Sequence, residues 1–226
     1  MELDQLALEI HQRLLDFYGH PTWHLPLTPV EELVSTILSQ NTNDVNRDRA
    51  YERLVGKFTS WEEVRDAPEE EVIEAIRVAG LANQKGPRIQ NALKLITEER
   101  GEIELEFLKT MPAEEARAWL EDIKGVGPKT AAIVLLFALN KPAFPVDTHV
   151  HRVTGRLGLR PETMSAAKAH EYLAEVFPED SYHDAHLNII QLGREICQAR
   201  QPQCPMCPLK DICRYYLEDY RNDDKP

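Results

Sequence analysis

The cysteines are the feature that most constrains how this chain can fold. All four lie in the last 30 of its 226 residues. They are spaced C-x6-C-x2-C-x5-C, as Cys197, Cys204, Cys207 and Cys213. Four thiols gathered in one short segment, in a chain with no secretion signal, indicate a metal site rather than disulfides. Such a segment folds around its metal, because the free energy of metal binding becomes free energy of folding.

Two kinds of metal group use four cysteines, structural zinc and iron–sulfur clusters. A zinc ribbon usually has two close cysteine pairs, whereas only Cys204 and Cys207 form such a pair here. The wide and uneven intervals favour an iron–sulfur cluster, with zinc as the alternative.

The rest of the chain is typical of an all-α protein. Apolar residues recur every three or four positions in most segments, and no alternating strand pattern or hairpin signature is present. The patterns and the capping residues predict helices at residues 2–17, 30–39, 45–58, 68–80, 85–100, 112–122, 129–139, 148–157, 165–176 and 184–197. Residues 129–139 are apolar on every side, which predicts a buried helix.

Charge is unevenly distributed along the chain. The net charge of −12 would repel nucleic acid if it were spread uniformly. However, residues 61–75 contain seven acids and one base, whereas residues 123–161 contain six bases and one acid. A basic face able to bind DNA phosphates is compatible with this pattern, and chance clustering is the alternative.

No segment of the sequence predicts a membrane contact. No apolar run reaches the roughly 20 residues of a membrane span. The acidic start, Met1–Asp4, lacks the basic and apolar regions of a signal peptide. We therefore expect a cytoplasmic protein, associated with the nucleoid if it is bacterial.

A glycine turn between two predicted helices is the second feature that points to chemistry. Glycines such as Gly125 and Gly127 permit a tight turn that brings main-chain N–H groups close to an anion, and the next helix adds its positive end. A lone Gly-x-Gly is often a plain connection, but Gly-Val-Gly-Pro-Lys-Thr-Ala before a buried helix is more specific. Lys129 lies in the first turn, where the helix dipole disfavours an ammonium. An uncharged amine can form a Schiff base with a sugar carbon, and simple pairing with phosphate is the alternative.

Asp147 follows Lys129 by 18 residues, in the sequence Val-Asp-Thr-His. Its plainest role is the N-cap of the helix predicted at residues 148–157. A capping aspartate that faces a pocket can also stabilise the positive charge that develops on a sugar ring.

Together these segments resemble the endonuclease III family of helix-hairpin-helix DNA glycosylases. The matching residues are 120–131, 146–153 and the four cysteines, and the resemblance covers nearly the whole chain. It implies an all-α fold of two helical domains with a DNA-binding cleft between them. The six-helix barrel domain, with the hairpin, would be residues 22–141. The iron–sulfur cluster domain would be residues 1–21 plus 142–226.

The resemblance also implies an activity and its partners. The family's members are base-excision repair enzymes with AP lyase activity, here expected to act as a monomer on oxidised pyrimidines or abasic sites in double-stranded DNA. Lys129 would attack C1′ of the flipped nucleotide and form a Schiff base, and β-elimination would then cut the strand. Asp147 would support the sugar cation and activate the lysine. The four cysteines would hold a [4Fe–4S] cluster.

Further positions carry over one by one. The resemblance implies DNA contacts at the hairpin residues Gly125, Val126 and Gly127, and also at Asn41, Leu81, His149 and Arg152. Leu81 matches a wedge that enters the gap left by the flipped base, although a leucine packed at a helix end is an equal alternative. Ser39, Asp44 and Glu121 match polar positions near the pocket. The chain departs from the family pattern at Asn41, where a glutamine is usual, and at Lys124, where a proline is common.

Related enzymes fit the sequence less well. Adenine-mispair glycosylases lack a lysine at the position of Lys129, mismatch thymine or uracil glycosylases commonly have tyrosine there, and the guanine-oxidation branch lacks the cluster. Outside the enzymes, two alternatives are a DNA-binding module without catalysis and a zinc-stabilised adaptor. Retention of Lys129 and Asp147 disfavours a module that has lost its chemistry. A zinc adaptor would be colourless when purified, whereas a [4Fe–4S] protein is yellow-brown.

Overall fold

The computed structural model describes residues 2–22 and 26–220. Every regular element within those ranges is helical, which confirms the predicted all-α class. The chain divides into two compact units, one formed by Pro26–Lys141 and the other by Met1–Leu25 with Pro142–Pro226. We call these the middle unit and the terminal unit.

Membrane insertion was also assessed from the helices. Among the residues that the structure describes, none of the helices is both long enough and apolar enough to cross a membrane.

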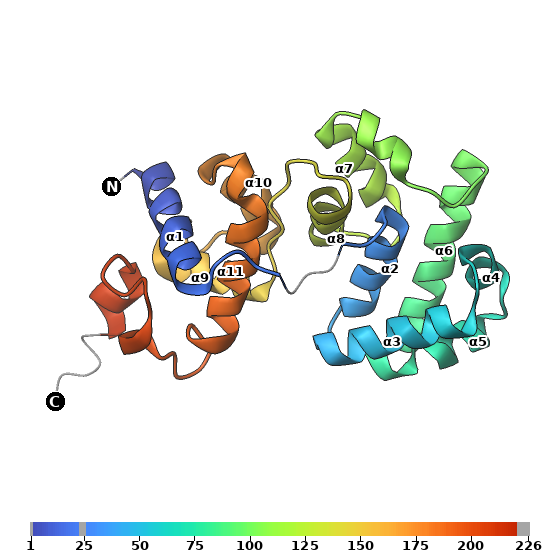
Figure 1. The fold of residues 1–226 in the computed structure, drawn as a ribbon, viewed down its shortest axis with the longest axis horizontal. Coiled ribbons are helices and arrows are strands. Elements are labelled where there is room, and N and C mark those ends of the chain that lie inside the picture. The colour runs from blue at the N-terminus through green and yellow to red at the C-terminus, as the bar shows by residue number, and fades with distance from the viewer. Residues whose placement is uncertain (1, 23–25, 221–226) are drawn as a thin grey trace. The chain divides into compact units, whose positions relative to one another are not determined.

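The middle unit is a group of helices joined by short turns (Figure 1). Its α-helices are α2 (Pro29–Ser39), α3 (Asp44–Lys57), α4 (Trp61–Asp66), α5 (Glu69–Ala75), α6 (Ala82–Arg100), α7 (Ala113–Asp122) and α8 (Pro128–Ile133). The 3₁₀ turns η1 (Arg77–Ala79) and η2 (Glu106–Thr110) connect them, and the π-helix η3 (Val134–Ala138) continues α8.

Helix α2 is central to the core of the middle unit. It packs against α3, α6 and α8, and its side chains Leu33, Ile37 and Leu38 are fully buried. The helix starts as predicted, because Pro29 occupies its first turn and the Glu31 carboxylate accepts a hydrogen bond from the Thr28 N–H at 2.8 Å.

Some elements of the middle unit differ from the sequence prediction. Helices α4 and η2 were not predicted, because six and five residues are too few to display a helical period. Helix α6 begins at Ala82 rather than at the predicted Lys85. Leu81 is its N-cap residue, and the Leu81 carbonyl accepts a hydrogen bond from the Lys85 N–H at 3.0 Å.

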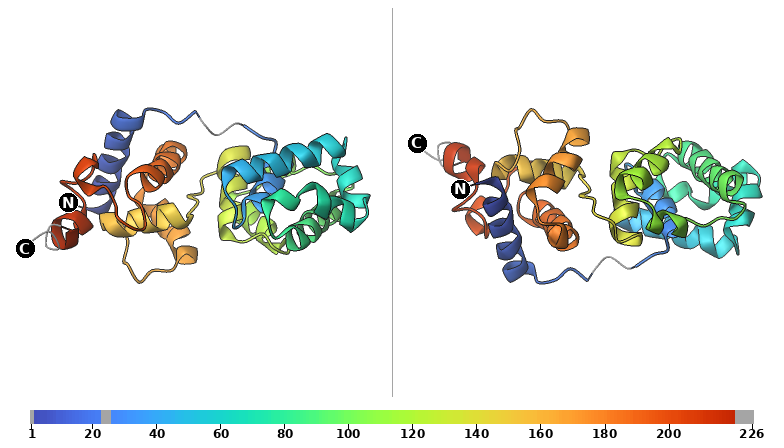
Figure 2. Two further views of the ribbon diagram at one scale, coloured as in Figure 1. Left: turned by 90° about the horizontal axis from the view of Figure 1, so that it is seen from below. Right: turned by 90° about the horizontal axis from the view of Figure 1, so that it is seen from above.

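The terminal unit joins the two ends of the described chain. It comprises α1 (Leu3–Tyr18), α9 (Thr148–Leu157), α10 (Ala166–Val176) and α11 (Tyr182–Glu195), with the short elements η4 (Glu179–Ser181), η5 (Cys204–Met206) and η6 (Tyr216–Tyr220). Helix α11 packs against both α1 and α9. The N-terminal helix therefore lies beside elements from the last third of the chain, as all the views show (Figures 1 and 2).

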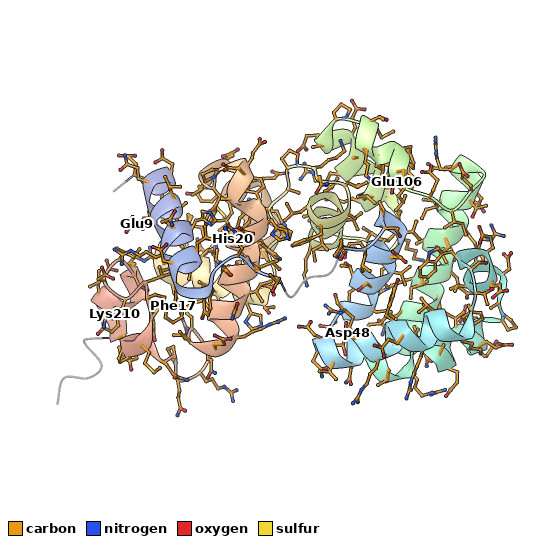
Figure 3. All side chains as sticks on the ribbon, in the orientation of Figure 1. Glu9, Phe17, His20, Asp48, Glu106 and Lys210 are labelled. Carbon is orange, nitrogen blue, oxygen red and sulfur yellow. The ribbon has the colours of Figure 1, made fainter. Side chains whose placement is uncertain are left out.

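Aromatic stacking and long-range polar contacts hold the terminal unit together. The rings of Phe144 and Phe177 stack with their centroids 4.8 Å apart. Arg13 of α1 forms an ion pair with Asp211 at 2.7 Å. Charged side chains such as Asp48 and Glu106 in the middle unit lie on exposed positions of their helices, whereas Glu9 of α1 is half-buried (Figure 3).

Candidate functional site

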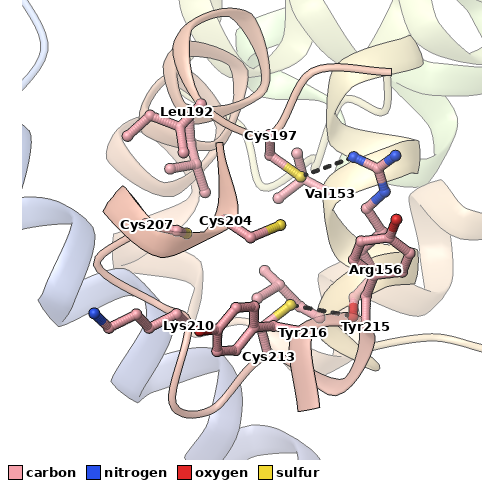
Figure 4. Close-up of a pocket in the computed structure, with 12 residues that line it drawn as sticks. Val153, Arg156, Leu192, Cys197, Cys204, Cys207, Lys210, Cys213, Tyr215 and Tyr216 are labelled. Atoms are coloured by element: carbon pink, nitrogen blue, oxygen red, sulfur yellow. Dashed lines mark hydrogen bonds between the residues drawn. The ribbon is translucent and has the colours of Figure 1, made fainter. Parts of the chain in front are cut away.

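The four cysteines line a single pocket of the terminal unit (Figure 4). Their thiols are free, and the pocket wall around them is largely apolar, with Val153, Leu157, Leu192 and Ile196 contributed by α9 and by α11 with the residue after it. Within residues 2–22 and 26–220, no three cysteine, histidine, aspartate or glutamate side chains are grouped so as to hold a single metal ion. The cysteines thus share one pocket without converging on one point.

Burial controls the charge of these thiols. Removal from water raises the pKa of Cys207 to about 12, and it also raises the pKa of Cys204 and of Cys213. Arg156 opposes this effect, because its positive charge lowers the pKa of Cys204 and Cys213. The net effect at Cys204, Cys207 and Cys213 favours the protonated thiol until a bound metal group supplies further positive charge. The chemistry of the donor set therefore fits a metal group.

Arg156 also shapes the loop that follows Cys197. Its Nη1 lies 3.4 Å from Cys197 Sγ and donates to the carbonyl of Gln198 at 2.7 Å, and its guanidinium lies over the Tyr215 ring, 4.8 Å from the centroid. In the sequence this residue counts only as one of the six bases between residues 123 and 161. The available signal was its position four residues after Arg152 on α9, which places both side chains on one helix face.

Arg152 links α9 to the same segment through main-chain oxygens. Its Nε donates to the carbonyl of Cys197 at 3.0 Å, and its Nη2 donates to the carbonyl of Gly193 at 2.8 Å. The same Nη2 lies 3.1 Å from Nδ1 of His149. Burial lowers the pKa of Arg152. The two residues predicted to contact DNA from α9 are thus in contact with each other, and Arg152 is bonded to the first residue of the cysteine segment.

Asp147 forms the N-cap of α9, as predicted. Its Oδ1 accepts a hydrogen bond from the Val150 N–H at 2.7 Å, and the side chain is half-buried. The cap fixes the carboxylate at the start of a helix in the terminal unit. Lys129 belongs to the middle unit.

The hairpin lies between α7 and α8 of the middle unit. Val126 is buried, and its N–H donates to the carbonyl of Ile123 at 2.9 Å, which closes the turn. Gly125 has a φ of +93°, a conformation that glycine adopts most readily. Gly127 is the N-cap of α8, so that Lys129 lies in the first turn and is half-buried. The structure thus has a helix, a tight glycine turn and a second helix at this point, as the sequence predicts.

The two predicted insertion residues share a strained backbone. Asn41 has a φ of +53° and Leu81 a φ of +49°, in the left-handed region that non-glycine residues seldom occupy. Both are exposed, and 47% of Leu81 is accessible. This exposure favours the wedge over the alternative, a leucine packed at a helix end, for Leu81, which is the N-cap residue of α6. Strain of this kind persists where the surrounding structure fixes it, and it concentrates at functional sites.

The three predicted pocket residues differ in their surroundings. Ser39 Oγ donates to the carbonyl of Thr36 at 2.8 Å, and Asp44 forms an ion pair with Arg47 at 3.2 Å. Glu121 Oε1 is buried and has no hydrogen-bond partner within the described part of the chain. A buried acceptor without a donor is costly, so Glu121 is the one of the three that most needs a ligand.

Comparison with known proteins extends beyond these local features. Residues 34–179 match the family described as HhH-GPD superfamily base excision DNA repair protein. Endonuclease III of Thermotoga maritima is 34% identical over 95% of this chain and 93% of its own length. Endonuclease III of Sulfolobus acidocaldarius is 35% identical over 84% and 83%. A solved structure of a trapped covalent endonuclease III–DNA intermediate matches with a TM-score of 0.84 at 29% identity, covering 98% of this chain and 100% of that one. The likeness therefore includes both units and not the hairpin alone.

Proposed function

Because the chain belongs to the endonuclease III family of HhH-GPD base excision DNA repair proteins, we propose that it is a DNA glycosylase and AP lyase that removes oxidised pyrimidines from duplex DNA. Membership of this family confirms the resemblance found in the sequence. The observation that carries the proposal is the near-complete match to an endonuclease III that was trapped covalently on DNA. A lyase of this kind must offer an amine to the sugar, and Lys129 is the lysine that follows the hairpin turn.

In the proposed mechanism Lys129 is the nucleophile. The Nζ lone pair attacks C1′ of the flipped nucleotide, the bond from C1′ to the base breaks, and the base leaves with the bonding electrons and takes up a proton. Ring opening gives the Schiff base between Nζ and C1′. Loss of a proton from C2′ then expels the 3′ phosphate by β-elimination, which cuts the strand. Lys129 lies in the first turn of α8, directly after the hairpin turn that is proposed to bind a phosphate, and its side chain is half-buried.

Asp147 is proposed to act on the same nucleotide. Its carboxylate would stabilise the positive charge that develops on the sugar as the base leaves, and it would accept a proton from the lysine. The cap bond to the Val150 N–H uses only Oδ1, which holds the carboxyl group in a fixed orientation. This leaves Oδ2 for the two proposed roles, since the cap bond engages the other oxygen.

The DNA contacts are assigned to segments of both units. The amides of Gly125–Gly127 would bind a phosphate, while Asn41 and Leu81 would enter the duplex where the base is flipped out. Glu121, whose buried Oε1 has no donor among residues 2–22 and 26–220, would accept a hydrogen bond from the extruded base. Ser39 and Asp44, which match the other polar positions of the family's pocket, would lie beside that base. Arg152 is bonded to the Cys197 carbonyl and lies 3.1 Å from His149 Nδ1, so we assign this pair to aligning the cysteine segment against DNA.

We assign the cysteine pocket to a [4Fe–4S] cluster held by Cys197, Cys204, Cys207 and Cys213. Zinc is the alternative, and the wide, uneven cysteine spacing, in which only Cys204 and Cys207 form a close pair, favours the cluster. When bound, the cluster would supply structural support to a loop that does not fold alone. The terminal unit would then be the cluster domain, and the middle unit the six-helix barrel domain.

The proposal is tested by trapping the Schiff base. The purified protein is incubated with a duplex that carries one thymine glycol, borohydride is added, and a covalent protein–DNA band is sought on a denaturing gel. We expect a band that Lys129→Gln removes and that the exposed-lysine control Lys94→Gln retains. A band with an abasic site alone would keep the lyase and reject oxidised pyrimidines as substrates. No band with either substrate would reject the proposed enzyme in favour of a monofunctional or binding-only protein.

A further inference from the structure

A fully buried lysine lies beneath the two strained loops of the middle unit. Lys85, on α6, has 0% of its surface exposed. Its Nζ donates to the carbonyl of Leu38 at 2.7 Å and to the carbonyl of Ala79 at 2.9 Å. The two carbonyls come from segments that are 47 and 6 residues from Lys85 in the sequence. One side chain therefore joins two separate stretches of backbone.

Both carbonyls belong to the C-terminal ends of helical segments. Leu38 lies in the last turn of α2, and Ala79 is the last residue of η1. Carbonyls at such ends lack N–H partners within the helix and carry partial negative charge. A cation placed between them satisfies both. Burial opposes the charge and lowers the pKa of Lys85 to about 8.

Each end leads directly into a strained residue. Asn41 follows Leu38 by three positions, and Leu81 follows Ala79 by two. Both have positive φ, and both are the residues proposed to enter DNA. A strained conformation is kept only when neighbouring contacts fix the chain on either side. Lys85 fixes the chain just before each of them.

The next turn of α6 connects the hairpin to the same loops. Arg88 Nη1 donates to Gln40 Oε1 at 2.8 Å, and Gln40 Nε2 donates to the carbonyl of Gly125 at 3.2 Å. The Arg88 side chain also lies against Gly125, where an added Cβ would be 2.8 Å from Cδ. Gln40, which precedes Asn41, is therefore bonded within the protein and is not available to fill a gap in the duplex.

We propose that Lys85 and Arg88 are positioning residues that lock the Asn41 loop, the Leu81 loop and the Gly125 hairpin into one rigid DNA-inserting surface. This inference rests on the proposed function, because it concerns the segments assigned to DNA. Neither side chain touches the nucleotide in this scheme. They act by fixing the relative positions of the three segments, so that insertion, base flipping and phosphate binding occur together.

The rigidity is tested first without DNA. Hydrogen exchange is measured on Lys85→Met, which keeps the length of the side chain and removes its donors, and on the matched control Lys94→Met at an exposed position of the same helix. We expect amides of residues 39–44 and 79–82 to exchange at least tenfold faster in Lys85→Met and at the wild-type rate in Lys94→Met. Faster exchange at only one of the two loops, or at neither, would overturn the proposal.

The role in DNA insertion is tested with two substrates. A thymine glycol in duplex DNA must be flipped, whereas an abasic site in single-stranded DNA needs no flipping. We expect Lys85→Met to lower excision from the duplex at least tenfold and trapping on the single strand much less. An equal loss on both substrates would show that the variant merely reduces the folded fraction, and would overturn the proposal.

Arg88→Met provides a second variant in case Lys85→Met does not fold. Arg88 is only half-buried, and its loss should release Gln40 and speed exchange at residues 123–127, again with a larger loss on the duplex than on the single strand. Unchanged exchange at the hairpin would overturn its part of the proposal. A wild-type protein that traps neither substrate would instead reject the proposed function, and the exchange result would still stand alone.

Discussion

The segment from Cys197 to Cys213 and the loops beside α6 are both largely irregular, but they are held by different means. The loops are braced by polar side chains of the chain itself, since Lys85 and Arg88 supply donors to backbone and side-chain oxygens. The cysteine segment surrounds an apolar pocket in which burial raises the pKa of three thiols. Arg156 donates a hydrogen bond to Cys197 Sγ, and main-chain hydrogen bonds lower the pKa of Cys207 and Cys213, but burial outweighs them.

The difference shows where each region obtains its stability. Donors and acceptors that satisfy one another inside a helical unit leave nothing to be supplied from outside. Thiols that would have to ionise in an apolar pocket gain little until a metal group compensates the charge. We therefore expect the cysteine segment to depend on its proposed cluster and the middle unit to fold without it.

The largest effect is expected from removing one sulfur. Cys213→Ser should remove one of the four proposed cluster ligands, so that iron binding falls and most of the protein is lost from the soluble fraction. Met206→Ser is the control, because it makes a polar change at a 69% exposed residue within the same segment. Soluble yield, iron per chain and visible absorption measure the effect.

The same variant separates the two regions. In whatever Cys213→Ser protein stays soluble, hydrogen exchange should be fast throughout the terminal unit and near the wild-type rate at the core of α2 and α6. A variant with normal yield and no bound metal would contradict the proposed dependence on the cluster. Loss of protection in α2 as well would show that the middle unit also depends on the pocket.

The sequence indicated one of these regions far better than the other. The spacing of the cysteines is visible without any structure, because metal ligands must be particular residue types at limited intervals. Helix α9 was equally visible, since Asp147 caps its start and Gly158 ends it with a φ of +84°. Short elements such as α4 contain too few residues to show a period.

The bracing of the loops was hidden for a physical reason. Lys85 lies four residues before Ile89 on the buried face of α6, and a lysine on an apolar face is the only trace of its role in the sequence. Its acceptors are main-chain carbonyls, which every residue possesses, so no residue type marks them. Only the packing of α2 and η1 around α6 brings Leu38 and Ala79 to the ammonium.

A smaller effect on the free energy of unfolding is expected from pH. It tests whether Lys85 is charged while it holds the carbonyls of Leu38 and Ala79. Its pKa is about 8 in the folded protein and near 10.5 when unfolded, so the unfolded chain binds more protons between these values. Stability should therefore rise with pH across that window. At about 1.4 kcal/mol per pKa unit the upper limit is about 3 kcal/mol, and the two carbonyls, which favour the ammonium, reduce it.

This pH effect is read as a difference between proteins. The free energy of unfolding is measured by denaturant titration from pH 7 to 10.5 for wild type and Lys85→Met, because other groups that titrate there are common to both. We expect the wild type to gain stability relative to Lys85→Met as the pH rises. Parallel curves would mean that Lys85 keeps its ordinary pKa in the folded protein, and that burying its charge costs little free energy.

The smallest effect tests how closely the hairpin is packed against α6. Gly125→Ala introduces a Cβ at a φ of +93° and at 2.8 Å from Arg88 Cδ. Arg88 cannot withdraw freely, since its far end is bonded to Gln40. We expect a loss of about 2 kcal/mol in the free energy of unfolding, of which roughly half is the left-handed backbone.

Two glycines of the same unit divide that loss into its parts. Gly101 has a φ of +81° and no atom within 4 Å of an added Cβ, so Gly101→Ala should cost about 1 kcal/mol from the backbone alone. Gly127 has an ordinary φ of −108° and open space, so Gly127→Ala should be neutral or stabilise by up to about 1 kcal/mol. If Gly125→Ala costs no more than Gly101→Ala, Arg88 moves aside without penalty and the hairpin is not braced by α6. The comparison with the cysteine segment would then rest on the Asn41 and Leu81 loops alone, which Lys85 holds through the carbonyls of Leu38 and Ala79.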